Sequence, residues 1–448
     1  MPLLSTFGAA SARAFGMGTV GGESYWIARY APSTNRNNEY IYGVDVDSSG
    51  NVYCTGVSAT NPYNNAVYMV LSSDGEVTTF KDLGRTNIEN VATNDYFTNC
   101  FLDGNGYLIT CGQSIYNTGN TLKSIIAKFD ISDGSLNTAT ELQYENVATA
   151  VKPDRSSSST DIYVLSPYAS KVGMTKLQSD LSLRWQKEYN VVPGHNSRFI
   201  AAHDVDTSGN VYIVGSYDSN TTNRDVATIF KINSSGTIQW TKGLQKTSPT
   251  AGHCRFNNVA VDSSGNAFTV GYTPDNSYMV CKYSSSGTLS VAKKLTGPNQ
   301  QLRHLAIDSE DNVIVGGYDS TGSLSGDSPY IIKLNNSLNT IAWARHIDRA
   351  VDLRSSGISV DASDNIYVHG TDAENDFFVA KIPSDGSLTG TYSNYKYETF
   401  SVSVADATDL NATTATLYQQ SGSMAGITTN AGTLPSSNRT VTVTKDTI

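Results

Sequence analysis

The sequence predicts an all-β protein built from one repeated sheet module. Three observations lead to this class: a recurring strand–turn–strand motif, a nearly regular spacing between its copies, and a composition rich in turn-forming residues. The clearest copy, Val44–Tyr53, alternates apolar and polar residues, turns at Ser48–Asn51 and then resumes an extended apolar run. Gly50 in this turn can adopt a positive φ without a steric penalty. The pattern therefore indicates two antiparallel strands joined by a tight turn.

Seven copies of this motif follow one another along the chain. Each opens its turn with an aspartate, and consecutive aspartates lie 46 to 56 residues apart. These marker aspartates are Asp47, Asp103, Asp154, Asp206, Asp262, Asp308 and Asp361. A unit of about 50 residues with four short strands is typical of a β-propeller blade. The sequence thus predicts a seven-bladed β-propeller of four-stranded antiparallel blades.

The remaining strands of each blade follow from the same pattern. A polar loop leads to a third strand, and a second Ser/Gly/Asp turn leads to a fourth strand that carries Trp185, Trp240 or Trp343 in three copies. The third strands are expected at Val67–Leu71, Ile125–Phe129, Gly173–Leu177, Thr228–Ile232, Met279–Tyr283, Ile331–Leu334 and Phe377–Ile382.

A solitary strand around Trp26 predicts how the ring closes. Trp26 lies 21 residues before Asp47, and the same spacing separates Trp185 from Asp206, whereas Gly390 stands where the last copy would have its tryptophan. We expect the N-terminal strand to supply the outer position of the last blade, because an open ring would leave unpaired sheet edges.

The chain divides into a propeller and two ends. We expect an N-terminal docking segment at residues 1–22, a propeller at 23–393 and an extended, β-rich C-terminal arm at 394–448. The first segment would not fold alone, so it is either a frayed tail or an arm that docks on a partner. Its candidate docking residues are Leu3, Leu4, Phe7 and Phe15. The C-terminal arm carries too few apolar residues for a core and favours an extended arm or a strand added to a partner's sheet.

Composition excludes several classes of function. The net charge of −10 argues against nucleic-acid binding. An odd count of five cysteines without zinc spacing indicates buried free thiols in a reducing compartment. The chain contains no apolar run long enough to span a membrane, and its N-terminus lacks the basic and apolar regions of a signal peptide.

One set of residues is a candidate ligand site. Arginines fall five to eight residues before four of the marker aspartates, in the crossovers that lead to the innermost strands, and histidines lie close by. The set is Arg198, Arg255, Arg303, Arg354, His195, His253 and His304. These side chains would gather near the rim of the central channel and could hold an anionic ligand or a sugar phosphate. The alternative is that each arginine pairs with a carboxylate or carbonyl of a neighbouring blade.

The sequence does not favour metal binding or catalysis. The pairs Asp45/Asp47 and Asp204/Asp206 resemble calcium loops, but no later acid completes the ligand set, so turn capping is favoured and no metal is expected. A lysine recurs in nearly every third strand, which indicates a structural role across blades: Lys128, Lys176, Lys231, Lys282, Lys333 and Lys381. No nucleophile, zinc or phosphate-loop motif is present, so we expect neither catalytic residues nor a cofactor, and not an enzyme.

Two stretches resemble known families. The blade with Trp240-Thr-Lys, Val261–Asn266 and Met279–Tyr283 resembles the bacterial and phage β-propeller repeat called SBBP, over roughly residues 24–393. The opening Met1–Gly16 is similar to the starts of virion structural proteins of marine tailed phages, cyanophages among them. The resemblance implies a virion protein that folds in the host cytoplasm.

The expected function combines these features. We expect a tail fibre or tail-associated appendage that docks by its termini to other virion proteins and to sister subunits of a homo-oligomer. Its variable propeller loops would bind a host-surface glycan, and neither nucleic acid nor membrane insertion is expected. Two alternatives stay open: a polysaccharide-degrading propeller enzyme (a depolymerase), and a purely structural capsid or tail component without a ligand.

Overall fold

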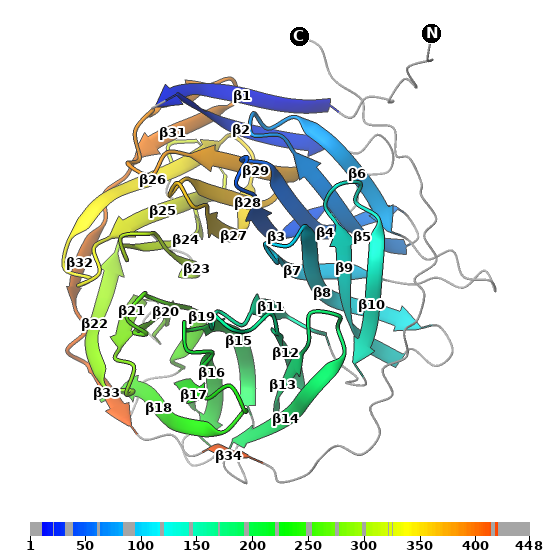
Figure 1. The fold of residues 1–448 in the computed structure, drawn as a ribbon. Coiled ribbons are helices and arrows are strands. Elements are labelled where there is room, and N and C mark those ends of the chain that lie inside the picture. The colour runs from blue at the N-terminus through cyan, green and yellow to red at the C-terminus, as the bar shows by residue number, and fades with distance from the viewer. Residues whose placement is uncertain are drawn as a thin grey trace.

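The computed structural model describes most of the chain as seven sheets set around a central axis (Figure 1). The described residues are 11–20, 22–31, 39–60, 63–83, 95–116, 121–142, 147–168, 171–191, 197–219, 224–247, 253–273, 277–297, 302–320, 322–324, 326–413 and 417–419. Within these ranges no helix is long and apolar enough to cross a membrane.

Each sheet is one blade, and its strands follow the chain from the axis outward. Blade 1 contains β3 (Tyr40–Val46), β4 (Val52–Thr60), β5 (Tyr63–Leu71) and β6 (Val77–Leu83). Blade 2 contains β7 (Tyr96–Leu102), β8 (Tyr107–Tyr116), β9 (Thr121–Asp130) and β10 (Leu136–Leu142). Blade 3 contains β11 (Ala150–Pro153), β12 (Ile162–Tyr168), β13 (Lys171–Leu177) and β14 (Leu183–Val191). Blade 4 contains β15 (Ser197–Val205), β16 (Val211–Ser219), β17 (Arg224–Ile232) and β18 (Ile238–Lys246).

The last three blades repeat this order. Blade 5 contains β19 (Arg255–Val261), β20 (Ala267–Tyr272), β21 (Tyr278–Tyr283) and β22 (Leu289–Thr296). Blade 6 contains β23 (Leu302–Ile307), β24 (Val313–Asp319), β25 (Ser328–Leu334) and β26 (Ile341–Arg349). Blade 7 contains β27 (Leu353–Val360), β28 (Ile366–Asp372) and β29 (Phe377–Ile382). The prediction of seven blades with four antiparallel strands each is confirmed once the N-terminal strand is counted.

The N-terminal strand closes the ring. β2 (Glu23–Ala31) pairs antiparallel with β29, and Trp26 lies opposite Lys381 in the register. β1 (Ser11–Val20) then pairs with β2 and adds a fifth strand. Residues 11–20 therefore belong to blade 7, which corrects the expectation that 1–22 form a separate docking segment. Leu3, Leu4 and Phe7 lie outside the described residues, as does the side chain of Phe15.

The C-terminal arm runs backward around the outside of the propeller. A hairpin of β30 (Gly390–Tyr392) and β31 (Tyr395–Thr399) adds to blade 6, and β32 (Ser403–Asp406) adds to blade 5. β33 (Leu410–Thr413) and β34 (Leu417–Gln419) add to blades 4 and 3. We call residues 390–419 the belt. Of the two forms expected for this segment, these residues take that of an extended arm. A strand added to a partner's sheet is wrong for the described strands, because they pair with the edges of the chain's own blades.

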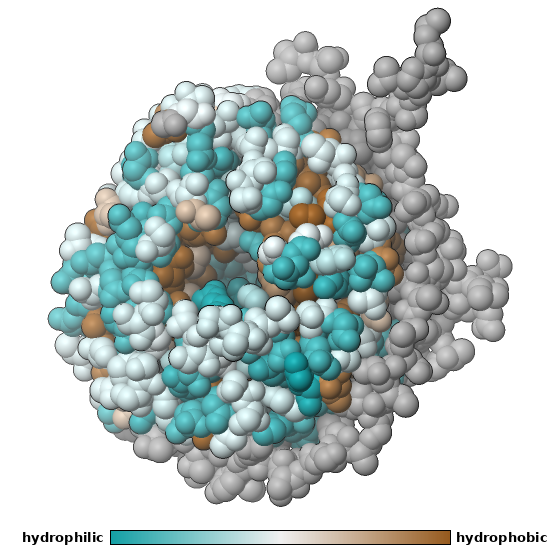
Figure 2. Space-filling model, viewed as in Figure 1, coloured by the Kyte–Doolittle hydropathy of each residue, from teal (hydrophilic) through white to brown (hydrophobic). Residues whose placement is uncertain are grey.

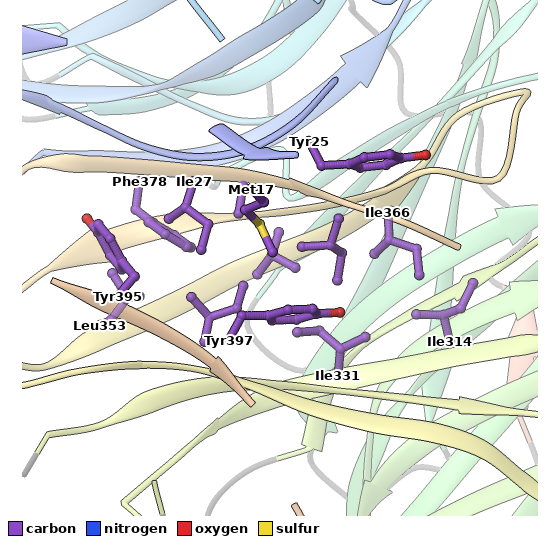
Figure 3. Close-up of a cluster of buried hydrophobic side chains, with 14 of the residues drawn as sticks. Met17, Tyr25, Ile27, Ile314, Ile331, Leu353, Ile366, Phe378, Tyr395 and Tyr397 are labelled. Atoms are coloured by element: carbon purple, nitrogen blue, oxygen red, sulfur yellow. The ribbon is translucent and has the colours of Figure 1, made fainter. Parts of the chain in front are cut away.

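Hydrophobic residues from both chain ends share one core cluster with blades 6 and 7. Met17 and Ile27 of the N-terminal strands pack with Phe378 of blade 7 and with Tyr395 and Tyr397 of the belt (Figure 3). All five side chains are buried. The cluster therefore fastens the closing strand and the start of the belt to the same two blades.

A repeated tryptophan contact joins neighbouring blades. The indole nitrogens of Trp26, Trp185, Trp240 and Trp343 each donate a hydrogen bond, 2.9 to 3.1 Å long, to a carbonyl oxygen in the outer turn of the next blade. The same turn carries a glycine with positive φ whose added Cβ would lie 2.6 to 3.0 Å from that ring, namely Gly75, Gly236, Gly287 and Gly386. The repeat thus encodes its own interface between blades.

The recurrent lysines act within and between blades. Lys128, Lys176, Lys231, Lys282 and Lys333 lie 2.8 to 4.0 Å from the marker aspartate of their own blade. Four of them also donate to a carbonyl oxygen in the outer turn of the next blade. In blade 7, Lys381 instead pairs with Glu23 of the closing strand at 2.8 Å. These contacts agree with the structural role across blades that the sequence predicted for the lysines.

Candidate ligand site in the central cavity

The innermost strands of the seven blades surround a central cavity of about 1350 Å³. Figure 2 shows it as a hollow at the centre of the ring, with polar and apolar residues on its wall. Its lining includes residues from β3, β7, β11, β15, β19, β23 and β27. Arg255, Arg303, His304 and Arg354 of the sequence-based site are among them.

Arg255 and Arg354 both pair with the preceding blade. Arg255 Nε lies 2.6 Å from Asp225 of blade 4, and its guanidinium stands over the ring of Tyr272 at 5.9 Å. Arg354 Nε lies 2.9 Å from Asp327 of blade 6. These two arginines therefore form the contact given as the alternative in the sequence analysis, an ion pair with a carboxylate of a neighbouring blade.

Arg303 differs from its counterparts. Its side chain is exposed to the cavity, and within the described residues no carboxylate pairs with it. Its guanidinium lies 5.6 Å from the centre of the Tyr318 ring, and that of Arg354 lies 5.8 Å from the same ring. Arg303 is therefore a charged group that is held in place by an aromatic ring and keeps its hydrogen-bond donors open.

The histidines of the sequence-based site are not free ligands. His304 is buried, and its Nε2 lies 3.1 Å from the carbonyl oxygen of Ser355 in blade 7. His253 lies 3.1 Å from Asp225 and is not part of the cavity lining. His195 and the side chain of Arg198 fall outside the described residues. The histidines that can be placed thus join blades instead of facing a ligand.

Burial sets the charge of the inner histidines. It lowers the pKa of His203 and of His304 to about 3 and that of His369 to about 4. His369 Nδ1 lies 3.2 Å from the carbonyl oxygen of Ile41 in blade 1, so it too bridges two blades. These rings are neutral near pH 7 and add no positive charge to the cavity.

The acids that resembled calcium loops are used by the backbone. Asp45 Oδ2 accepts a hydrogen bond of 2.7 Å from the amide of Leu102 in blade 2, and Asp204 Oδ2 accepts one of 2.8 Å from Val261 in blade 5. The marker aspartates accept the amides of their own turns, as Asp47 does from Ser49 and Asn51. The capping role favoured from the sequence agrees with these bonds.

One acidic cluster elsewhere is a charge network. Asp372, Glu374 and Asp376 of blade 7 lie close enough to share an ion. Arg29 contacts all three, and Arg349 lies 2.5 Å from Asp372. Two guanidinium groups therefore already compensate these carboxylates.

Sequence reasoning missed the tyrosines of the cavity. Tyr40 and Tyr42 of β3 stack with ring centres 5.6 Å apart and planes only 4° from parallel. Tyr272, Tyr278 and Tyr318 line the same cavity from blades 5 and 6. Tyr40 and Tyr42 stand on an innermost strand, whereas Tyr272, Tyr278 and Tyr318 stand on second and third strands. Position within the blade therefore does not separate these five from the many other tyrosines of the chain.

Comparisons with known proteins bear on the fold alone. No family model matches the chain, and no curated protein matches it. A periplasmic gluconolactonase from Pseudomonas aeruginosa has 12% sequence identity and a TM-score of 0.47, over 74% of this chain and 93% of that chain. A protein of unknown function from Bacteroides caccae has 15% identity and a TM-score of 0.39, over 64% of this chain and 94% of that chain. At these values neither likeness carries an argument about the site.

Proposed function

We propose that this protein is an adhesive glycan-binding propeller that serves on a phage virion as a tail fibre or tail-associated appendage. The observation that carries the binding role is the tyrosine-lined central cavity. Its volume of about 1350 Å³ exceeds the roughly 300–1,000 Å³ usual for small-molecule pockets, which leaves room for several sugar units.

Tyrosines suit saccharides because each ring offers an apolar face and a polar hydroxyl. In the stacked pair Tyr40 and Tyr42, both side chains are partly exposed on the cavity wall. A pyranose ring packs its C–H face on such a surface while its hydroxyl groups bond to polar neighbours. Weak contacts of this kind become strong when many copies act together on one particle.

In this proposal the protein binds the glycan without cleaving it. Hydrolysis of a glycosidic bond uses a pair of carboxyl groups placed about the scissile bond. The cavity carboxylates Asp206, Asp262 and Asp308 already accept amides of their own turns and lie near lysines. This occupation supports adhesion over the alternative of a depolymerase.

A glycan array followed by a reducing-end assay tests the proposal. We expect selective binding to some saccharides and no increase in reducing ends after incubation with the same saccharides. Binding of no saccharide would contradict the adhesive role, and new reducing ends would support the depolymerase.

The place on the virion has its own test. Because residues 11–20 form part of blade 7, the useful truncation removes only residues 1–10, which contain Leu3, Leu4 and Phe7. We expect the truncated chain to remain folded and to be absent from purified particles by mass spectrometry. Normal incorporation would contradict docking through this segment.

A further inference from the structure

The innermost strands share a backbone irregularity at one position. In six of the seven, the pairing with the second strand skips one residue that lies five residues before the marker aspartate. The skipped residues are Tyr42, Thr98, Ala201, Asn257, Arg303 and Ser356. Such β-bulges re-aim a side chain and are common beside binding sites. Apart from Ala201, whose side chain lies outside the described residues, all of them line the central cavity.

These bulge residues fall into two groups. Thr98 Oγ1 donates a hydrogen bond of 2.6 Å to the carbonyl oxygen of Ala148 in blade 3, and Asn257 Nδ2 donates one of 2.8 Å to Leu302 in blade 6. Their polar groups are used to join blades. By contrast, among the residues that the structure describes, no hydrogen bond engages the side chains of Arg303, Ser356 or Tyr42.

The three uncommitted residues lie on consecutive blades. Arg303 belongs to blade 6, Ser356 to blade 7 and Tyr42 to blade 1, which the closing strand makes neighbours in the ring. They form one continuous arc of the cavity wall. Tyr318 supports Arg303 at one end of this arc, and Tyr40 stacks on Tyr42 at the other.

We propose that this arc is a subsite for one acidic sugar residue, so that the ligand is a saccharide bearing a carboxylate. The proposal rests on the glycan-binding function and names its ligand class. Arg303 offers parallel N–H donors that match a carboxylate. The Tyr40–Tyr42 pair offers the apolar surface for the sugar ring, and the hydroxyl of Ser356 lies between them in the order of the blades.

The arc predicts a ligand held to one side of the axis. On the opposite wall, Thr149 of blade 3 occupies the same position relative to its marker, Asp154, and also lines the cavity. Nearby, Arg155 is already paired with Asp204 at 3.2 Å. The chain thus contains a matched control for the subsite within the same cavity.

Titration calorimetry with trigalacturonic acid, its methyl ester and neutral maltotriose tests the proposal. We expect the wild-type protein to bind trigalacturonic acid and Arg303→Gln to weaken that binding by about tenfold or more. Tyr42→Ala and Ser356→Ala should also weaken it, while Thr149→Ala on the opposite wall should weaken it far less than Arg303→Gln does. The methyl ester should bind the wild type as weakly as the acid binds Arg303→Gln. Circular dichroism confirms that each variant is folded.

Other results overturn the proposal and separate it from the proposed function. Equal affinity for maltotriose and trigalacturonic acid, or an unchanged affinity of Arg303→Gln, would refute the acidic subsite while glycan binding stands. Weakening by Thr149→Ala as strong as that by Arg303→Gln would place the ligand on the axis and refute the arc. Failure of the wild type to bind any saccharide, here and on the array, would remove the proposed function itself.

Discussion

The indole nitrogen of Trp26 donates a hydrogen bond of 2.9 Å to the carbonyl oxygen of Ser73, and this bond joins the closing strand of blade 7 to the outer turn of blade 1. It is the same contact that Trp185, Trp240 and Trp343 make between consecutive blades. Ring closure therefore uses the interface that the repeat already encodes, although the closing strand comes from the other end of the chain.

Substitution of Trp26 tests the closure. Trp26 is only 1% exposed, so we expect Trp26→Ala to lower the free energy of unfolding by about 3–5 kcal/mol. Trp185→Ala is the matched control, because Trp185 makes the same bond but is only partly buried, and it should cost less. Urea denaturation measures both. Equal losses would contradict the expectation that the deeper burial of Trp26 makes its contact the more stabilising of the two.

A pair of glycines isolates the packing on that ring. Gly75 and Gly104 both adopt positive φ, at 79° and 72°. A Cβ on Gly75 would lie 2.7 Å from the Trp26 ring, whereas one on Gly104 would meet nothing within 4 Å. Because the two φ angles are similar, the backbone strain of the two alanine variants is comparable, and Gly75→Ala should be less stable than Gly104→Ala by about 1–3 kcal/mol. Equal melting temperatures would show that the turn accommodates the added methyl group without a loss of stability.

The lysine of the third strand should matter most where its partner carboxylate is buried. Lys333 Nζ lies 2.8 Å from Asp308, whose side chain is almost fully buried. Burial raises the pKa of Asp308, but the bonds from Lys333 and Asn312 outweigh it and lower the pKa below its ordinary value. We expect Lys333→Met to cost about 3–5 kcal/mol of unfolding free energy because it leaves this acid unpaired.

Two further variants control that experiment. Adding Asp308→Asn to Lys333→Met should restore part of the loss, because the uncompensated charge is then gone. Lys171→Met should cost less than about 1 kcal/mol, since the Lys171 side chain is 32% exposed in its pair with Glu188, more than that of Lys333. A small loss for Lys333→Met would refute the structural role of the lysine row.

Acid should destabilise the propeller before its carboxylates titrate. Burial lowers the pKa of His203 and His304 to about 3 and that of His369 to about 4, whereas the unfolded value is near 6.5. Between about pH 6.5 and 4 the unfolded chain therefore binds protons that the folded chain does not. Stability is full above this window and falls by up to about 1.4 kcal/mol per pH unit for each histidine as the pH drops. Urea midpoints measured from pH 7 to 4 check the slope, which His304→Asn should reduce. A flat profile would contradict neutral buried rings.

Ion pairs should hold the belt against blades 4 and 5. Asp409 lies 3.1 Å from Lys246 of blade 4 and 2.9 Å from Lys294 of blade 5. We expect Asp409→Asn to speed amide hydrogen exchange in β32 and β33, and high salt to do the same in the wild type. Asp406→Asn is the control, because Asp406 is 72% exposed in its pair with Lys293 and should change little. Equal exchange in both variants would show that backbone pairing alone holds the belt.

The blades could be predicted because the same sequence pattern recurs in seven copies. The marker aspartates report the turns within each blade, and the outer turns and the tryptophan spacing report contacts between adjacent blades. Even the substitutions follow this logic: Asp311 and Asp364 stand in for glycine at positive φ and accept bonds from Ser263 and Ser309 of the preceding blade. Aspartate tolerates this conformation better than most residues, but the sequence offered no sign of these partners.

The belt and the outermost N-terminal strand could not be predicted in the same way. β32 and β33 contain few apolar residues, and they form strands because a blade edge is there to pair with. Arg303 was a candidate from the sequence, but Ser356 and Tyr42 of the cavity arc were missed for a different reason. Arg303, Ser356 and Tyr42 break the symmetry of the repeat, so only their shared distance from the marker aspartate could have brought them together.

The most direct test of this account is a crystal structure of the protein in complex with trigalacturonic acid. The account predicts a sugar residue in the central cavity, with its carboxylate on Arg303 and its ring against Tyr42. A saccharide bound only at the outer loops, or one centred on the axis without contact to Arg303, would contradict it.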